Sequence, residues 1–195
     1  FYAVRTSNGD GEALRIHITS GMTQLIVNKF KSAITSIANP SGNHIVTPIS
    51  IDIEGGTLRT RVMVRDVDVI ASGSVTGGTL TYTGISLVGS MLLDMSDVRF
   101  DMNIARMTDY ATSLIDIGKT TSTIDGVIRG VIVQRAQDPA HSNTITIRGT
   151  ATLTINEEIR IEDCEFIDST PGREVVFAGE SNAAKVYFYG NTWRQ

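Results

Sequence analysis

The sequence has little cysteine, no excess of positive charge and no long apolar run, and each shortage excludes a class of protein. Cys164 is the only cysteine among 195 residues, so the chain has no internal disulfide and no cysteine-rich metal site. The 17 Lys and Arg residues are outnumbered by 21 Asp and Glu and form no cluster, which argues against a nucleic-acid or anionic-membrane partner. No apolar run approaches the roughly 20 residues of a membrane span.

The length of 195 residues suits one domain with a sizeable core. We expect residues 1–43 to hold a strand and a capping helix, and residues 44–195 to form the main body. Phe1 stands where an initiator Met would, so the sequence predicts a processed product or part of a longer protein.

One segment near the start has the spacing of a helix. Between Gly21 and Asn39, apolar residues recur every three to four positions, and the segment ends at Asn39-Pro40, a strong helix stop. Thr, Val and Ile are common in it and favour a strand instead. Ahead of it, LRIHIT (14–19) alternates as a strand does. After Gly42 the composition indicates an all-β body, with 105–114 as the one other place for a helix.

This β-rich body repeats a short pattern at a nearly constant interval. The pattern reads apolar, any residue, Gly or Asp, small or apolar, any residue, apolar. It occurs as VRDVDV (64–69), MSDVRF (95–100), IRGVIV (128–133), IEDCEF (161–166) and FYGNTW (188–193). An interval of about 30 residues marks stacked units, each of which buries its apolar face against its neighbours.

A second series, of glycines, interleaves with the first. Its members are Gly55, Gly84, Gly118, Gly149 and Gly179. They recur at nearly the same interval as the first series, and each precedes its partner in that series by less than half of the interval. Two series that share one period predict a solenoid in which each coil contributes one member of each.

Asp and Gly share the third position because both tolerate the left-handed backbone conformation that turns a strand sharply. A role at the bends accounts for Asp66, Asp97 and Asp163, so a column of metal-binding or catalytic carboxylates is not needed to explain them. Such a bend lets Ile161 and Cys164 both face inward, where an unbroken strand would place them on opposite faces. We expect two inner columns: Val64, Met95, Ile128, Ile161 and Phe188, and then Val69, Phe100, Val133, Phe166 and Trp193.

The coil pattern resembles the right-handed parallel β-helix superfamily, the pectate-lyase-like fold, and within it viral tailspikes and appendages. The segment 21–39 and the turn NPSGNHIVTP after it are similar to the amphipathic segment that precedes the first coil in that superfamily. The five repeats predict about five coils. The resemblance implies carbohydrate binding or carbohydrate chemistry, and a homotrimer in the viral members. The paired aspartates of polygalacturonases, Gly-His-Gly and the pectate-lyase Arg-x-Pro-x-x-Arg do not occur, so no catalytic residue is assigned.

Outward positions beside the bend supply the candidates for glycan binding. These candidates are Arg129, Glu162, Glu165 and Tyr189. Neighbouring coils pair Asp68 with Arg99 and Arg129 with Glu162, at about 0–1 kcal/mol for each exposed pair. Glu162 and Glu165 flank one bend and diverge too much for a glycosidase pair, whose carboxyl groups stand roughly 5–10 Å apart. A pair assembled from two subunits stays open.

No cofactor or metal is expected. His17, His44 and His141 lie far apart in the sequence and have no metal-ligand spacing. Cys164 falls among inward-facing positions, so we expect an inert buried thiol and not a nucleophile.

The sequence therefore predicts a structural or adhesive β-helix module of a viral appendage or similar extracellular assembly. It would act at the virion or cell surface, with other virion proteins or a surface glycan as partners. Two alternatives stay open: a polysaccharide hydrolase or lyase with a groove or intersubunit site, and a fragment of a bacterial surface adhesin. Trp193 is the candidate oligomer contact, most simply in a homotrimer, because the last coil must be covered.

Overall fold

A computed structural model describes residues 2–6, 11–19, 22–39, 43–54, 59–75, 79–105, 110–118, 123–135, 142–148, 158–167, 175–178 and 185–194. All regular structure in these ranges is β-strand, and every strand pairing is parallel. The prediction of an all-β fold is confirmed. The described part of the chain contains no helical segment with the length and hydrophobicity needed to cross a bilayer.

The strands follow one another with short connections. In chain order they are β1 (Tyr2–Thr6), β2 (Gly11–Ile18), β3 (Gln24–Asn39), β4 (Asn43–Ile53), β5 (Thr60–Val75), β6 (Thr79–Ala105), β7 (Tyr110–Ile117), β8 (Thr123–Arg129), β9 (Ile132–Arg135), β10 (Ser142–Arg148), β11 (Glu158–Glu162), β12 (Glu165–Ile167), β13 (Val175–Ala178), β14 (Lys185–Tyr189) and β15 (Thr192–Arg194). Val, Ile and Thr dominate them, as expected of residues that pack well on a pleated surface.

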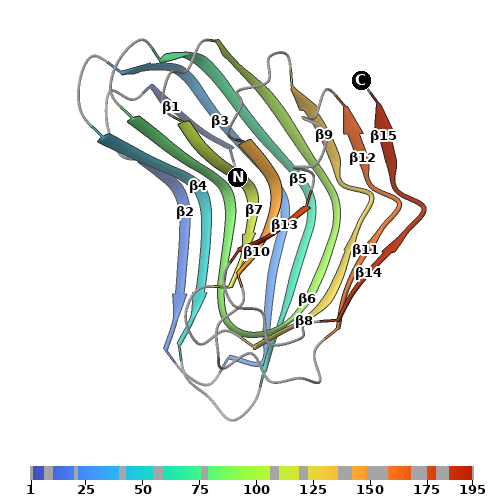
Figure 1. Cartoon of the computed structure of the whole chain (residues 1–195). Helices are drawn as coiled ribbons and strands as arrows, with labels where there is room; N and C mark the ends of the chain where they lie inside the picture. The colour runs from blue at the N-terminus through green and yellow to red at the C-terminus, as the bar shows by residue number, and fades with distance from the viewer. Residues whose placement is uncertain are drawn as a thin grey trace.

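The single sheet curls into a half-barrel with two walls (Figure 1). Wall A contains β1, β3, β5, the second half of β6, β8 with β9, β11 with β12, and β14 with β15. Wall B contains β2, β4, the first half of β6, β7, β10 and β13. From β2 onwards the chain alternates between the walls, and β6 belongs to both because it turns at Gly89, whose φ is 103°.

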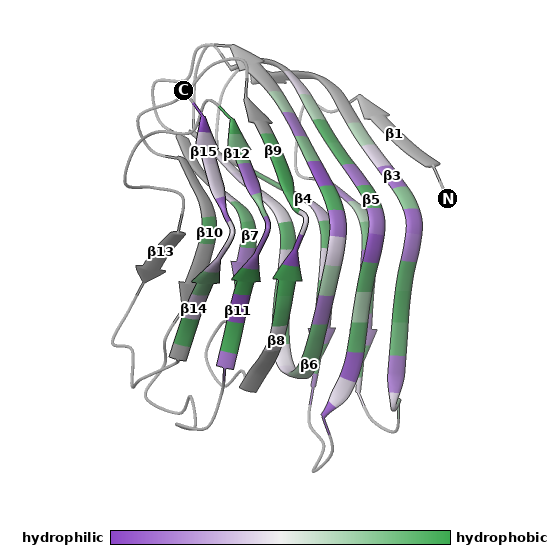
Figure 2. Cartoon of the chain, turned by 90° about the vertical axis from the view of Figure 1, so that its right-hand side faces the viewer, coloured by the Kyte–Doolittle hydropathy of each residue, from purple (hydrophilic) through white to green (hydrophobic). Residues whose placement is uncertain are grey.

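Both inner columns are confirmed. Val64 pairs with Met95, Met95 with Ile128, Ile128 with Ile161, and Ile161 with Phe188. The second column runs in the same way from Val69 through Phe100, Val133 and Phe166 to Trp193. Hydrophobic and hydrophilic residues alternate along β3 and β5 of the same wall (Figure 2). The core therefore lies between the two walls and is built from columns of inward-facing residues.

The bends have the backbone conformation that the sequence predicts. Asp66, Asp97 and Asp163 have φ values of 54°, 54° and 51°, and Gly130 and Gly190 have values of 57° and 62°. The bends at Gly130, Asp163 and Gly190 separate β8 from β9, β11 from β12 and β14 from β15, where the ribbon kinks at the right of Figure 1. Their role in turning the strand is confirmed.

The predicted capping helix at 21–39 is wrong, because residues 24–39 form strand β3. Lys29, with a φ of 52°, bends this strand at the same level as Asp66. The bend lets Val27 and Phe30, three positions apart, both face the core. A bent strand therefore imitates the three-residue spacing of a helix. Strand β3 pairs with β5 and continues wall A.

The glycine series does not form a column. Ile85 pairs with Ile115, so Gly84 lies level with Leu114 and not with Gly118. Gly55, Gly149 and Gly179 lie outside the described residues, as does His141. Of the possible helix at 105–114, the ends belong to β6 and β7, and residues 106–109 lie outside the described part.

Cys164 is buried in the core, with its Sγ 3.3 Å from the carbonyl oxygen of Glu162 and 3.8 Å from that of Ile128. Loss of solvation raises the pKa of this thiol from 9.0 to about 11. At neutral pH the group is a protonated thiol with little nucleophilic character, as the sequence predicts.

The raised pKa of Cys164 predicts a loss of stability in alkali. Its folded-state pKa of about 11 exceeds the unfolded value of 9.0, so the contribution is complete below pH 9 and falls as the pH rises towards 11. The expected loss in the free energy of unfolding is about 2–3 kcal/mol. Urea titrations at several pH values would measure it. Cys164→Val, which copies the valine at Val131 on the preceding coil, should lack this component, and an identical pH profile in both proteins would contradict the assignment.

Candidate functional site

The outer face of wall A carries the polar candidates. Immediately before the bend, one outward-facing row crosses the wall in register. It contains Arg65, Ser96, Arg129, Glu162 and Tyr189. Parallel pairing therefore places Arg129 beside Glu162, and Glu162 beside Tyr189, as the repeat predicts.

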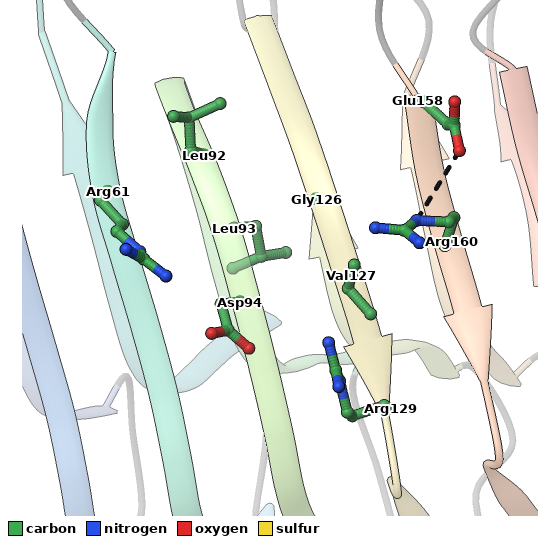
Figure 3. Close-up of a pocket in the computed structure, with 9 residues that line it drawn as sticks. All are labelled: Arg61, Leu92, Leu93, Asp94, Gly126, Val127, Arg129, Glu158 and Arg160. Atoms are coloured by element: carbon green, nitrogen blue, oxygen red, sulfur yellow. Dashed lines mark ion pairs between the residues drawn. The ribbon is translucent and has the colours of Figure 1, made fainter.

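An open groove of about 620 Å³ lies on this face, next to the row (Figure 3). It crosses β5, β6, β8 and β11. Its lining residues are Arg61, Leu92, Leu93, Asp94, Gly126, Val127, Arg129, Glu158 and Arg160. Leu92 is 43% exposed and offers apolar surface in the groove, whereas Val127, which lies between the charged groups, is buried. The groove thus combines apolar surface with charged walls.

Three arginines stand around this apolar surface. Arg160 is held by carboxylates on its own strand, with its Nε 3.7 Å from Glu158 and its Nη1 3.6 Å from Glu162. Figure 3 shows the side chains of Arg129 and Arg160 reaching towards Val127 from two neighbouring strands. Within the described residues, Arg129 has no ion pair. Arg129 is exposed, so a ligand can reach it from solvent.

Asp94 provides a negative group on the same side of the groove as Arg61 (Figure 3). Its carboxylate is hydrogen-bonded to Arg65, which approaches from the strand next to it. This pairing compensates the charge of Asp94. Arg160 is compensated in the same way by Glu158 and Glu162, so Arg129 is the stronger candidate for contact with a ligand.

The structure brings together some of the predicted site residues and separates others. Arg129 lines the groove, and Glu162 lies beside it and contacts Arg160. Tyr189 lies at the end of the same row and stacks on Tyr187, with ring centroids 6.3 Å apart. Glu165 follows the bend and pairs with Arg194 at 3.1 Å, so it takes no part in the groove.

The predicted charge ladders have the expected register but not all of the expected partners. Asp68 is level with Arg99, and it also pairs with Lys31 at 3.8 Å. Arg129 is level with Glu162, yet among the described residues the ion-pair partner of Glu162 is Arg160. Contacts along one strand therefore compete with contacts across the wall.

Arg61, Arg160 and Leu92 are groove residues that the sequence-based prediction missed. It considered only the outward positions next to the bend. The alternation within EIRIE (158–162), which puts Glu158, Arg160 and Glu162 on one face, is the signal that could have found Arg160.

Trp193 lies at the end of its inner column, where β15 is the last strand in the described part of wall A. It stacks on Phe166, with ring centroids 5.7 Å apart, and remains 49% exposed. Phe188, at the end of the other column, is 44% exposed. These two rings form an apolar edge. The oligomer contact at Trp193 stays a prediction.

Neither a protein-family model nor a curated protein nor a solved structure matches this chain. What the groove can bind is therefore inferred from its own residues.

Proposed function

We propose that the curled sheet is a right-handed parallel β-helix and that the groove on wall A binds an acidic surface glycan. The alternation of the chain between two parallel walls supports the helical architecture, and parallel crossovers are right-handed in the great majority of proteins. The bends at Lys29, Asp66, Asp97, Gly130, Asp163 and Gly190 support six coils, one more than the repeat alone predicts. The chain is then an adhesive module.

The observation that carries the binding proposal is the presence of Arg129 and Arg160 in one groove with the exposed apolar side chain of Leu92. A guanidinium group presents a fork of donors that matches a carboxylate, and such charge-assisted hydrogen bonds are about twice as strong as neutral ones. The carbon face of a sugar ring can pack against the exposed side chain of Leu92. A uronic or sialic acid residue satisfies both features, whereas a neutral sugar uses only one.

The dimensions of the groove suit an oligosaccharide. It crosses four strands, so it spans three inter-strand spacings, or roughly 14 Å at about 4.8 Å each. Its open form allows a long polymer to pass through without a free end. Binding along a repeating surface polysaccharide follows naturally from this shape.

A viral appendage is the setting that the sequence resemblance suggests, and a homotrimer is the assembly it implies. The exposed rings of Phe188 and Trp193 are the surface that a second chain would cover in such an assembly. Glycan binding by wall A does not depend on this contact, because the groove lies on the outer face of β5, β6, β8 and β11.

Removing the guanidinium of Arg129 is expected to weaken binding of an acidic glycan about tenfold or more. A hydrogen bond to a charged group contributes about 1.5–3 kcal/mol. Calorimetric titration of the wild-type chain and of Arg129→Ala with uronate-containing, sialylated and neutral oligosaccharides would measure the change. The affinity of the wild-type chain should also fall as salt is added, since the groove is open to solvent.

Arg15→Ala provides the matched control. It removes the same charge from an exposed position on β2, outside the groove, and should leave glycan affinity unchanged. Equal affinity for neutral and acidic glycans, or equal losses in the two variants, would overturn the proposal. Release of shorter oligosaccharides during the titration would favour the polysaccharide-degrading alternative.

A further inference from the structure

We propose that His17, Asp52 and Glu54 form a binding site for a divalent transition-metal ion on wall B. His17 lies on β2 and Asp52 on β4, and the two residues are paired in the parallel register. Glu54 follows Asp52 by two positions, and its N–H donates a hydrogen bond to the carbonyl of Ile18 at 2.8 Å. The backbone of both strands therefore holds the three side chains at one place on the surface.

The donor atoms of this triad already lie close together. His17 Nδ1 is 3.4 Å from Asp52 Oδ2, and His17 Nε2 is 3.7 Å from Glu54 Oε2. One donor atom from each residue can be chosen so that all three lie within 4.8 Å of one another. Bonds of roughly 2.0–2.2 Å to a tetrahedral zinc ion place its ligand atoms somewhat closer than this. The side chains are partly exposed, which leaves them room to rotate towards a shared ion.

The chemistry of the triad calls for a cation. A neutral imidazole has one N–H donor and one lone pair, but here each ring nitrogen faces a carboxylate. One carboxylate therefore confronts a lone pair of the ring unless a positive charge intervenes. A metal ion bound by one ring nitrogen and by both carboxylates removes this conflict and neutralises the two negative charges.

The donor set indicates which metal fits. One imidazole nitrogen and two carboxylates suit Zn²⁺, Co²⁺ or Mn²⁺ better than Ca²⁺, which takes oxygen ligands. Three protein ligands leave a position for water or for a group from a ligand. The site lies on wall B and shares no residue with the groove on wall A, so it does not rest on the proposed glycan binding.

The sequence conceals this site because His17 and Asp52 lie on different coils, far apart along the chain. Metal motifs are recognised by short spacings within one segment, as in helices and loops. In a parallel sheet, residues one full circuit apart become neighbours, and only the strand register identifies them.

Titration with Zn²⁺ alone, and separately with Co²⁺ alone, would test the proposal. We expect one ion per chain from calorimetry, a rise in the thermal unfolding midpoint, and a shift of the His17 ring resonances in NMR spectra. Bound Co²⁺ should give the visible absorption of a site with mixed nitrogen and oxygen ligands. His17→Ala should weaken binding tenfold or more, and Asp52→Asn and Glu54→Gln, which keep the side-chain shapes, should each weaken it clearly.

His44→Ala is the matched control, because it removes another histidine from β4 and should leave the affinity for Zn²⁺ unchanged. Far-ultraviolet circular dichroism would confirm that each variant keeps its sheet. Binding that survives in His17→Ala would overturn the proposal. So would a His17 that gains a proton on acidification but whose resonances do not respond to Zn²⁺, since a proton would then be the only cation at the triad.

Discussion

Replacement of Gly89 by alanine is expected to lower the free energy of unfolding by about 3 kcal/mol or more, because strain and overpacking each cost about 1–3 kcal/mol. Gly89 has a φ of 103°, which side-chain-bearing residues rarely adopt. A Cβ atom there would lie 2.0 Å from the carbonyl oxygen of Ile53, and this oxygen belongs to the backbone and cannot rotate away. Ile53 and Gly89 are paired between β4 and β6 within wall B, so relief requires these two strands to move apart locally. Urea unfolding followed by circular dichroism would measure the loss.

Gly130→Asn tests whether the steric clash, and not the replacement of a glycine with positive φ, causes the loss of stability in Gly89→Ala. Gly130 also has a positive φ, of 57°, but the nearest atom to an added Cβ is Asp97 Oδ1 at 3.4 Å. Asp97 and Asp163 occupy the same level on the neighbouring coils, and Asn tolerates this conformation without adding charge. We expect a change below about 1 kcal/mol. Similar losses in the two variants would show that the clash with Ile53 is not the cause.

The parallel columns could be predicted because a bend residue with a positive φ marks each coil. Asp66, Asp97 and Asp163 are chemically suited to that conformation, and the apolar residues around them repeat at a fixed offset. Stacking follows from the repeat, since each coil must cover the apolar face of the next. Both the inner columns and the outward row next to the bend could therefore be read from the sequence.

The first bend could not be predicted, because its residue breaks the pattern. Lys29 takes the position of an aspartate or a glycine, and Ser32 takes the position that is apolar in the later coils. The Oγ of Ser32 is buried and has no hydrogen-bond partner among the described residues. At Ser32 this coil is flanked by β1 and β5, and it still carries residues that the repeat excludes further along. Because no Asp or Gly marks the bend at Lys29, the three-residue spacing of Val27 and Phe30 resembles the spacing of a helix.

The glycine series failed for a different reason. The prediction assumed that glycines at similar intervals occupy equivalent positions on successive coils. The register of wall B is instead set by inward-facing apolar pairs such as Ile85 with Ile115. A Cβ atom on Gly84 would lie 2.6 Å from the backbone oxygen of Leu114 and 2.7 Å from Phe100 Cε1, so a side chain has no space there. Gly118 instead has a left-handed backbone conformation, with a φ of 82°. The reasons for a glycine at position 84 and at position 118 are therefore unrelated.

The candidate sites depend on contacts that no single segment contains. The groove needs four strands and the orientation of Arg160, which two carboxylates on its own strand determine. The triad at His17 needs the register between β2 and β4. Sequence periodicity indicates which residues face outward, but it does not determine which of two nearby carboxylates an arginine will pair with.

Phe100→Ala is expected to cost about 3–5 kcal/mol of unfolding free energy, the usual range for a fully buried aromatic residue. Phe100 has no exposed surface and lies between Val69 and Val133 in the second inner column. Its ring also reaches across the core to Gly84, so it joins wall A to wall B. The truncation leaves a cavity that neighbours on parallel strands cannot fill, because their backbones are fixed by the ladder.

Trp193→Ala removes a larger ring from the same column and serves as the control. Trp193 is 49% exposed and contacts Phe166 on one side, so its loss should cost about 1–2 kcal/mol, the lower part of the range for ordinary substitutions. Unfolding should be followed by circular dichroism in both variants, since Trp193 is the only tryptophan. Equal costs for the two truncations would contradict the assignment of Phe100 to the buried middle of the column and of Trp193 to its exposed end. A larger loss of unfolding free energy in Phe100→Ala would show that stability depends most on the middle of the column, where both walls and both neighbouring coils surround the side chain.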